Sequence, residues 1–125
     1  MGTREGGQMR QASVLLVEDE VLIRMMVAGM VEELGHRVVA EAGTLKDAER
    51  LAQTTEFDLA LLDVKLGYRS VAPVAEILMK RGLPFVFLTA YAPDRLPHTL
   101  GKALVLQKPF KMSKLKDAIE TILAG

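Results

Sequence analysis

The segment "SVLLVEDEVLIRMMVAGM", residues 13–30, changes its hydrophobic pattern near its middle. Residues 13–17 are mostly branched and apolar, a pattern typical of a strand that is covered on both faces. After the acidic residues 18–20, apolar side chains recur at helical spacing until Gly35, a residue suited to ending a helix. A buried strand followed directly by an amphipathic helix is the repeating unit of α/β proteins.

Outward from this segment, the same alternation continues along the chain. Four further apolar segments predict strands, and Thr44 and Ser70 are suited to cap the helices that follow two of them. The predicted strands are residues 37–42, 57–63, 84–89 and 103–107, and the predicted helices are residues 45–53, 71–81 and 113–123. The stretch "AYAPDRLPHTLG" (90–101) contains two prolines and a glycine, so we expect an irregular, mobile loop with a short or disordered fourth helix.

The order of these elements predicts a doubly wound α/β fold. Strands that alternate with helices are connected by right-handed crossovers, which gives a parallel sheet of five strands with helices on both faces. A chain of 125 residues, half of them apolar, is long enough for one domain with its own core. We expect residues 1–11 to form a flexible tail and residues 12–125 to form the domain.

Composition argues against several classes of function. Sixteen basic residues balance sixteen acidic ones without long blocks of either sign, so we expect no nucleic-acid partner and no membrane partner. The absence of cysteine excludes disulfides and cysteine-ligated metals and fits a cytoplasmic location. The stretch "MGTREGGQMR" (1–10) has no apolar core of signal-peptide length, and no apolar stretch approaches the roughly 20 residues that cross a bilayer.

Polar residues follow four of the five predicted strands. Glu18 and Asp19 follow the first strand, Asp63 ends the third, Thr89 ends the fourth and Lys108 follows the fifth. Ligands of a doubly wound sheet bind beyond the carboxyl ends of its strands, so we expect these side chains to lie close together. Three neighbouring carboxylates repel one another unless they are protonated or bind a cation. Oxygen ligands of this kind suit Mg²⁺.

This set of residues contains the parts that phosphoryl transfer needs. The reaction requires an in-line nucleophile, positive charge near the equatorial oxygens and a donor that steadies them. Asp63 would supply the nucleophile, Lys108 and Mg²⁺ the positive charge, and Thr89 the donor. Taken singly, each residue is better explained as an ordinary turn or helix-terminus residue, so the functional interpretation depends on their joint occurrence.

The motifs that hold these residues resemble those of response-regulator receiver domains, the phosphoacceptor half of two-component signalling. The similarity extends from about residue 12 to residue 124, and Pro109 resembles the cis-proline of the family. It implies a flavodoxin-like sheet with strand order 2-1-3-4-5. The matching motifs, in family order, are "VEDE" (17–20), "LLDVKL" (61–66), "FLTAY" (87–91) and "QKPF" (107–110).

The resemblance implies a role for each matching residue. Asp63 would accept a phosphoryl group from a sensor histidine kinase or a histidine phosphotransfer protein and form an acyl phosphate. Asp19 and Asp63 would bind Mg²⁺ through their carboxylates, Glu18 partly through water, and Lys65 through its backbone carbonyl. Lys65 and Tyr91 occupy positions that tune acyl-phosphate hydrolysis in the family.

One position departs from the usual family pattern. Receivers commonly carry an aromatic residue three places before the lysine, and here that residue is Val105. The stretch "PFVFLTAY" (84–91) is similar to the PFxFATGY signature of a subgroup of alphaproteobacterial single-domain receivers, which also lack this aromatic. Thr89 and Lys108 would still contact the phosphoryl oxygens, and we expect Thr89 and Tyr91 to form the switch.

Alternative functions remain open at this stage. Phosphatases of the haloacid dehalogenase type use similar residues, but their nucleophile lies on the first strand in a DxDx[TV] pattern. The other alternative is a binding module, either a degenerate receiver that works without phosphate or a flavodoxin-like nucleotide binder. No glycine-rich loop follows the first strand, which disfavours nucleotide binding. We expect a stand-alone signalling switch or a phosphate sink with a downstream protein partner, and not an enzyme.

Several other conspicuous residues receive structural interpretations. His36 and His98 are separate from the predicted acidic cluster, so we expect them to have surface or structural roles. Met25, Met26 and Met30 are expected to pack within the first helix. The predicted apolar stripes of that helix are Val21, Met25, Ala28 and Val31 on one side, with Met30 and Leu34 beside them.

Overall fold

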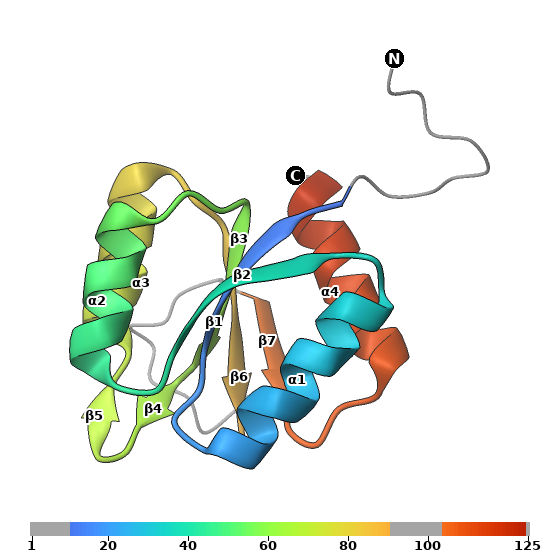
Figure 1. Ribbon diagram of the computed structural model, residues 1–125, viewed down its shortest axis with the longest axis horizontal. Coiled ribbons are helices and arrows are strands. Elements are labelled where there is room, and N and C mark those ends of the chain that lie inside the picture. Colours follow the sequence, from blue (N-terminus) through green and yellow to red (C-terminus); the bar gives the residue numbers. More distant parts are fainter. Residues whose placement is uncertain (1–10, 91–103, 125) are drawn as a thin grey trace.

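The computed structural model describes residues 11–90 and 104–124, which form alternating strands and helices (Figure 1). The described strands are β1 (Ser13–Val17), β2 (Arg37–Ala42), β3 (Leu59–Asp63), β4 (Lys65–Leu66), β5 (Arg69–Ser70), β6 (Phe85–Thr89) and β7 (Leu104–Gln107). The described helices are α1 (Val21–Glu33), α2 (Leu45–Thr54), α3 (Ala72–Arg81) and α4 (Met112–Ala124). No helix in these two ranges has both the length and the apolar character needed to span a membrane.

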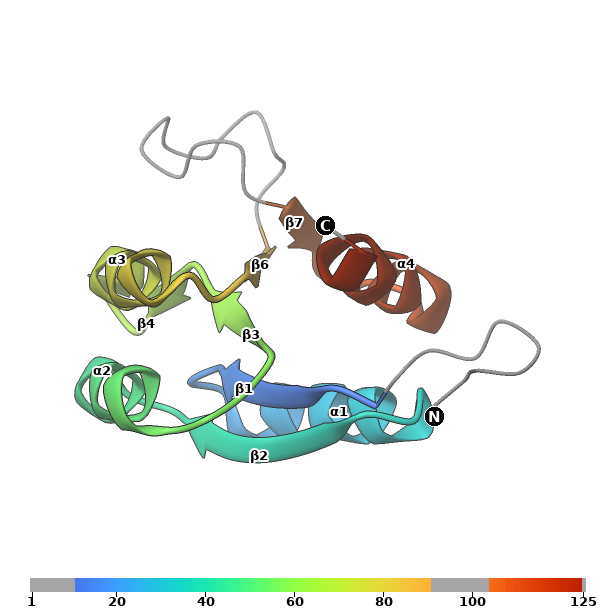
Figure 2. The same cartoon turned by 90° about the horizontal axis from the view of Figure 1, so that it is seen from above.

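Five of the strands form one parallel sheet in the order β2-β1-β3-β6-β7. Helices α2 and α3 cover one face of the sheet, and α1 and α4 cover the other (Figure 2). This arrangement confirms the predicted doubly wound fold, because β6 and β7 are the fourth and fifth strands of the sheet along the chain. The predicted short or disordered fourth helix falls within residues 91–103, outside the described residues.

The central strand β3 shows why the sequence is apolar at consecutive positions. Ala60 and Leu62 belong to the hydrophobic cluster on the α2–α3 side, whereas Leu59 and Leu61 belong to the cluster on the α1–α4 side. All four of these side chains are fully buried. A strand with helices on both faces must bury successive residues, so the apolar pattern continues until the strand ends at Asp63.

The residues that cap α2 and α3 agree with the sequence predictions, except at the start of α3. Thr44 caps α2 and accepts a hydrogen bond from the N–H of Asp47, and Gly82 ends α3 with a φ of 71°. Ser70 is not the capping residue of α3, because that position is Val71. The Ser70 hydroxyl still accepts a hydrogen bond from the N–H of Ala72 at 3.0 Å, so it satisfies one donor at the start of the helix.

The predicted buried face of α1 is wrong in its first half. Val21, Met25 and Met26 are 56%, 63% and 57% exposed, whereas Met30 packs against the core as expected. The first turns of α1 are apolar on more than one side, so residue spacing alone does not define which side faces the sheet. The residues of α1 that pack against the sheet are Ile23, Val27, Ala28, Met30 and Val31.

Candidate functional site

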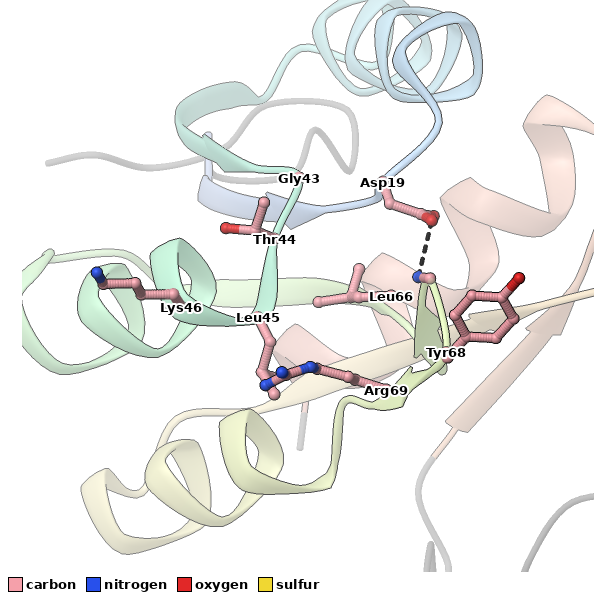
Figure 3. Close-up of a pocket in the computed structure, with 9 residues that line it drawn as sticks. Asp19, Gly43, Thr44, Leu45, Lys46, Leu66, Tyr68 and Arg69 are labelled. Atoms are coloured by element: carbon pink, nitrogen blue, oxygen red, sulfur yellow. Dashed lines mark hydrogen bonds between the residues drawn. The ribbon is translucent and has the colours of Figure 1, made fainter.

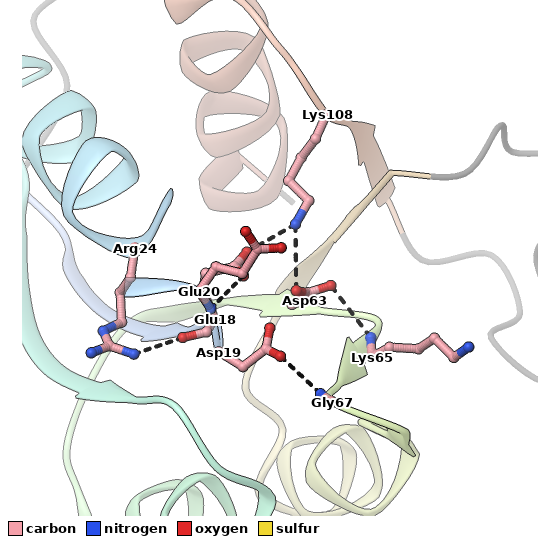
Figure 4. A network of polar contacts seen from close by, with 8 residues as sticks. All are labelled: Glu18, Asp19, Glu20, Arg24, Asp63, Lys65, Gly67 and Lys108. Atoms are coloured by element: carbon pink, nitrogen blue, oxygen red, sulfur yellow. Dashed lines mark hydrogen bonds and ion pairs between the residues drawn. The ribbon is translucent and has the colours of Figure 1, made fainter. Parts of the chain in front are cut away.

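Three acidic side chains meet at the carboxyl edge of the sheet (Figure 4). Glu18 and Asp19 directly follow β1, and Asp63 is the last residue of the neighbouring strand β3. One carboxylate oxygen from each residue lies within 4.8 Å of the others. Glu18 is fully buried, and the side chain of Asp63 is 12% exposed. The predicted acidic cluster is therefore present in the structure.

Lys108 brings a positive charge to this cluster. Its Nζ lies 2.9 Å from Oε1 of Glu18 and 3.4 Å from Oδ2 of Asp63. The backbone N–H of Lys108 donates to the carbonyl oxygen of Thr89, which continues the β6–β7 pairing past the end of β7. The peptide bond between Lys108 and Pro109 is cis, as the sequence motif suggested. The lysine ammonium thus points toward the carboxylates.

Burial and charge change the acid–base properties of the cluster. Burial and, next, the charge of Glu18 raise the pKa of Asp63 from 3.8 to about 7, although the charge of Lys108 acts in the opposite direction. Burial alone would lower the pKa of Lys108, but its hydrogen bond to Glu18 and the charges of Asp63 and Glu18 raise it. The described cluster contains three carboxyl groups and one ammonium, so it has an excess of negative charge.

The donor set of the cluster fits a hard divalent cation. Each of Glu18, Asp19 and Asp63 offers a carboxylate oxygen, and these oxygens lie close enough to bind one ion together. Magnesium prefers oxygen ligands and keeps several waters, so two or three carboxylates suffice for a site. A divalent cation would also neutralise the charge that Lys108 leaves uncompensated.

The other predicted site residues are Thr89, Lys65 and Tyr91. Thr89 is buried at the end of β6, one residue beyond Leu88, which pairs with Asp63. The N–H of Lys65 donates to Oδ1 of Asp63 at 3.3 Å, and the Lys65 side chain points away from the acids (Figure 4). Tyr91 lies outside the described residues. The structure therefore brings together Glu18, Asp19, Asp63 and Lys108, with Thr89 on the adjacent strand.

Sequence reasoning missed a short hairpin that contacts the cluster. Strands β4 and β5 pair antiparallel across Gly67, which has a φ of 63°. The N–H of Gly67 donates to Oδ2 of Asp19 at 2.9 Å (Figure 4). The sequence feature that could have indicated this hairpin is the glycine in "KLGYRS" (65–70), because glycine readily adopts the left-handed conformation of tight turns. The hairpin fixes the orientation of the Asp19 carboxylate.

Two hollows border the candidate site. One, of about 520 Å³, lies beside Asp19 between the start of α2 and the β4–β5 hairpin, and Lys46 and Arg69 contribute to its lining (Figure 3). The other, also of about 520 Å³, lies beside Lys108 between α1 and the segment after β7, and Met26 and Phe110 contribute to its lining. Each hollow is therefore lined by one residue of the candidate site, Asp19 in the first and Lys108 in the second.

The described histidine has a structural role. His36 is 5% exposed, and its Nδ1 accepts a hydrogen bond from the N–H of Ala12 at 3.0 Å. Burial lowers the pKa of His36, although the charge of Glu120 acts in the opposite direction. The neutral imidazole therefore helps to hold the start of β1. His98 lies outside the described residues.

Comparisons with known proteins relate the chain to bacterial signalling proteins. Residues 14–120 match the family model of the response regulator receiver domain. The chain is 41% identical over 111 residues to the transcriptional regulatory protein PdtaR of Mycobacterium tuberculosis, and the match covers 86% of this chain and 54% of PdtaR. The chain therefore spans about half the length of this curated relative.

Solved structures show the same fold. SdrG from Sphingomonas melonis Fr1 is similar with a TM-score of 0.80 and 37% identity, and the match covers 90% of this chain and 97% of that one. The response regulator PhyR from Brucella abortus is similar with a TM-score of 0.82 and 32% identity, over 94% of this chain and 49% of that one. The flavodoxin-like strand order inferred from the sequence is consistent with these matches.

Proposed function

Because this chain belongs to the family of response regulator receiver domains, we propose that it is a phosphoacceptor in a two-component phosphorelay. Asp63 is the proposed acceptor, and the donor is the phosphohistidine of a sensor histidine kinase or of a histidine phosphotransfer protein. The observation that supports this proposal most directly is the contact of Lys108 with both Glu18 and Asp63 at the edge of the sheet. The protein would act as a signalling switch or as a phosphate sink.

In the proposed reaction, an oxygen of Asp63 attacks the phosphorus of the phosphohistidine. A phosphorus–oxygen bond forms, the phosphorus–nitrogen bond breaks, and the electron pair of that bond returns to the imidazole of the donor. Lys108 would stabilise the charge on the phosphoryl oxygens, and the hydroxyl of Thr89 would donate to one of them. The product is an acyl phosphate on Asp63, which water later hydrolyses.

A divalent cation fits this proposal. Asp19 and Asp63 would bind Mg²⁺ through their carboxylates, Glu18 partly through water, and Lys65 through its backbone carbonyl. When bound, Mg²⁺ would neutralise negative charge on the phosphoryl group and on the acids. The hydrogen bond from Gly67 would hold the Asp19 carboxylate in place for this role.

The face of α1 beside the cluster is suited to contact the donor protein. Val21, Leu22, Met25 and Met26 are all more than half exposed, although they are large and apolar. Exposed apolar side chains that gather in one place commonly mark protein contacts, and methionine adapts to differing partners. One residue of this face, Met26, lines the same hollow as Lys108, which contacts the proposed acceptor Asp63.

The switch residues also belong to the proposal. Val105 is partly buried on β7 and pairs with Phe87, so an aliphatic residue occupies the position where most receivers carry their aromatic switch. We therefore assign the switch to Thr89 and Tyr91, and the tuning of hydrolysis to Lys65 and Tyr91. Backbone relaxation of residues 90–102, measured with and without a phosphate mimic, tests this assignment. Identical relaxation in both states would contradict it.

The central experiment is phosphorylation by a small phosphodonor. The protein is incubated with Mg²⁺ and acetyl phosphate, and its intact mass is measured. We expect wild type to gain one phosphoryl group and Asp63→Asn to gain none. Asp117→Asn, the same change at an exposed position of α4, is the matched control and should be phosphorylated like wild type. Labelling of Asp63→Asn to the wild-type level would refute the assignment of the acceptor.

The alternatives predict different results in the same assay. A degenerate receiver would bind its partner equally well with and without phosphodonor and would not gain mass. A phosphatase of the haloacid dehalogenase type would turn over a phosphate ester repeatedly without a kinase. The order of the motifs disfavours the phosphatase, because the acidic pair follows β1 and the proposed nucleophile ends β3.

A further inference from the structure

Arg24 lies on α1, outside the acidic cluster, but contacts the turn that carries two of its members. Its Nη1 donates to the backbone carbonyl oxygen of Glu18 at 2.8 Å (Figure 4). Its Nε lies 3.2 Å from Oε1 of Glu41 on β2. The side chain of Arg24 is 21% exposed. One guanidinium therefore connects α1, the β1–α1 turn and β2.

The carbonyl that Arg24 contacts belongs to the peptide group between Glu18 and Asp19. Because a peptide group is planar, fixing its carbonyl also fixes the N–H and the Cα of Asp19. The N–H of Glu18 donates to the carbonyl oxygen of Ala42 at 3.0 Å. The backbone of Glu18 is thus held at both of its polar groups, and this sets the position from which the Asp19 side chain extends.

Gly43 provides the space that the guanidinium occupies. A Cβ placed at position 43 would lie 2.7 Å from Nη1 of Arg24, which is too close for a stable contact. The φ of Gly43 lies outside the left-handed region, so its backbone would accept alanine. A side chain at this position would therefore displace the Arg24 guanidinium without straining the backbone.

We propose that Arg24 is a positioning residue that orients the β1–α1 turn so that Glu18 and Asp19 can bind a divalent cation, with Gly43 providing its space. This inference rests on the proposed function, because it gives Arg24 a role toward the cation of that site. Arg24 acts through the backbone of Glu18 and touches no carboxylate of the cluster. Loss of its contact would allow the turn to reorient and would lower the affinity for the cation.

The test measures Mg²⁺ binding to the whole chain by calorimetry, with Mn²⁺ as a second probe. Arg24→Ala should weaken Mg²⁺ binding by about tenfold or more, the usual effect of losing a residue that orients a metal ligand. Arg24→Lys should recover part of this loss. Gly43→Ala changes no charge but should also weaken binding, because its methyl group displaces the guanidinium. The double variant should lose little more than Arg24→Ala alone, since both changes remove the same contact.

Two variants serve as controls. Glu41→Gln removes an exposed charge pair but leaves the contact between Arg24 and the Glu18 carbonyl, so Mg²⁺ affinity should stay within about twofold of wild type. Arg50→Ala removes an exposed arginine of α2 that faces Asp47 and should leave the affinity unchanged. Circular dichroism selects the variants that are fully folded. If Arg24→Ala does not fold, the Mg²⁺ affinities of Arg24→Lys and Gly43→Ala decide the test.

The outcomes separate this inference from the proposed function. Wild-type Mg²⁺ affinity in the folded Arg24 and Gly43 variants would overturn the inference and leave the proposed function intact. Failure of wild type to bind Mg²⁺ would overturn both. Fully additive losses in the double variant would overturn the role given to Gly43, because the two residues would then act independently.

Discussion

Replacement of Asp63 by asparagine should stabilise the metal-free protein while it abolishes phosphorylation. In the described cluster, Lys108 lies closest to Glu18, so the negative charge of Asp63 is only partly compensated. Asparagine has nearly the same shape without the charge. The Glu18–Lys108 ion pair would remain in the variant, and the excess negative charge would be gone.

The size of this effect follows from the pKa of Asp63. Because folding raises this pKa from 3.8 to about 7, the contribution of Asp63 to wild-type stability is fully present below about pH 3.8 and is lost as the pH rises through about 7. At about 1.4 kcal/mol per pKa unit, the loss reaches about 4 kcal/mol at about pH 8. It is less than about 2 kcal/mol at about pH 5. Asparagine does not titrate, so Asp63→Asn should avoid this loss.

Urea unfolding in the presence of a chelator, followed by circular dichroism, measures the difference. We expect the gain in unfolding free energy of Asp63→Asn over wild type to increase by about 2 to 3 kcal/mol between about pH 5 and about pH 8. Mg²⁺ should reduce the gain at the higher pH, because it binds the native wild type. Asp117→Asn should show no such dependence. A gain that is equal at both pH values, or a loss at the higher one, would refute the explanation.

Three further outcomes are expected. Lys108→Met should lower the unfolding free energy by about 3 kcal/mol at neutral pH, because it leaves the buried Glu18 without its cation, and added Mg²⁺ should restore part of this loss in urea titrations. Leu61→Ala should cost about 2 to 5 kcal/mol in the same assay, because it opens a cavity in the fully buried α1–α4 side of the core. Gly82→Ala should lower the melting temperature, since alanine is strained at the left-handed end of α3, whereas Gly29→Ala within α1 should not.

The sequence determined the architecture because both faces of the sheet are covered. The consecutive apolar residues of β3 are buried on both sides of the sheet, and Asp63 marks where the strand and its apolar pattern end. The positions of Glu18, Asp19 and Lys108 followed from the same reasoning, since the carboxyl ends of parallel strands share one edge. Four members of the candidate site could therefore be predicted before the structure was known.

The parts that sequence reasoning missed depend on how separate elements of the structure meet. The exposure of Val21 and Met25 depends on how α1 lies against the sheet, which the spacing of apolar residues does not specify where a helix is apolar on several sides. The contacts of Arg24 with Glu18 and of Gly67 with Asp19 join residues on separate elements through backbone groups. Backbone groups are the same at every position, so no residue pattern predicts which of them will meet.

Lys108 shares its positive charge between two acids, and the unequal sharing makes Asp63 better suited than Glu18 to be the proposed nucleophile. Glu18 is completely buried, and an unpaired charge there would be costly, so the closest contact of Lys108 is with Glu18 at 2.9 Å. Asp63 receives the longer contact of 3.4 Å and keeps partial access to solvent. A nucleophile needs an accessible oxygen whose lone pairs are not fully engaged. The same imbalance that lowers the stability of the metal-free protein at high pH therefore leaves Asp63 available to react.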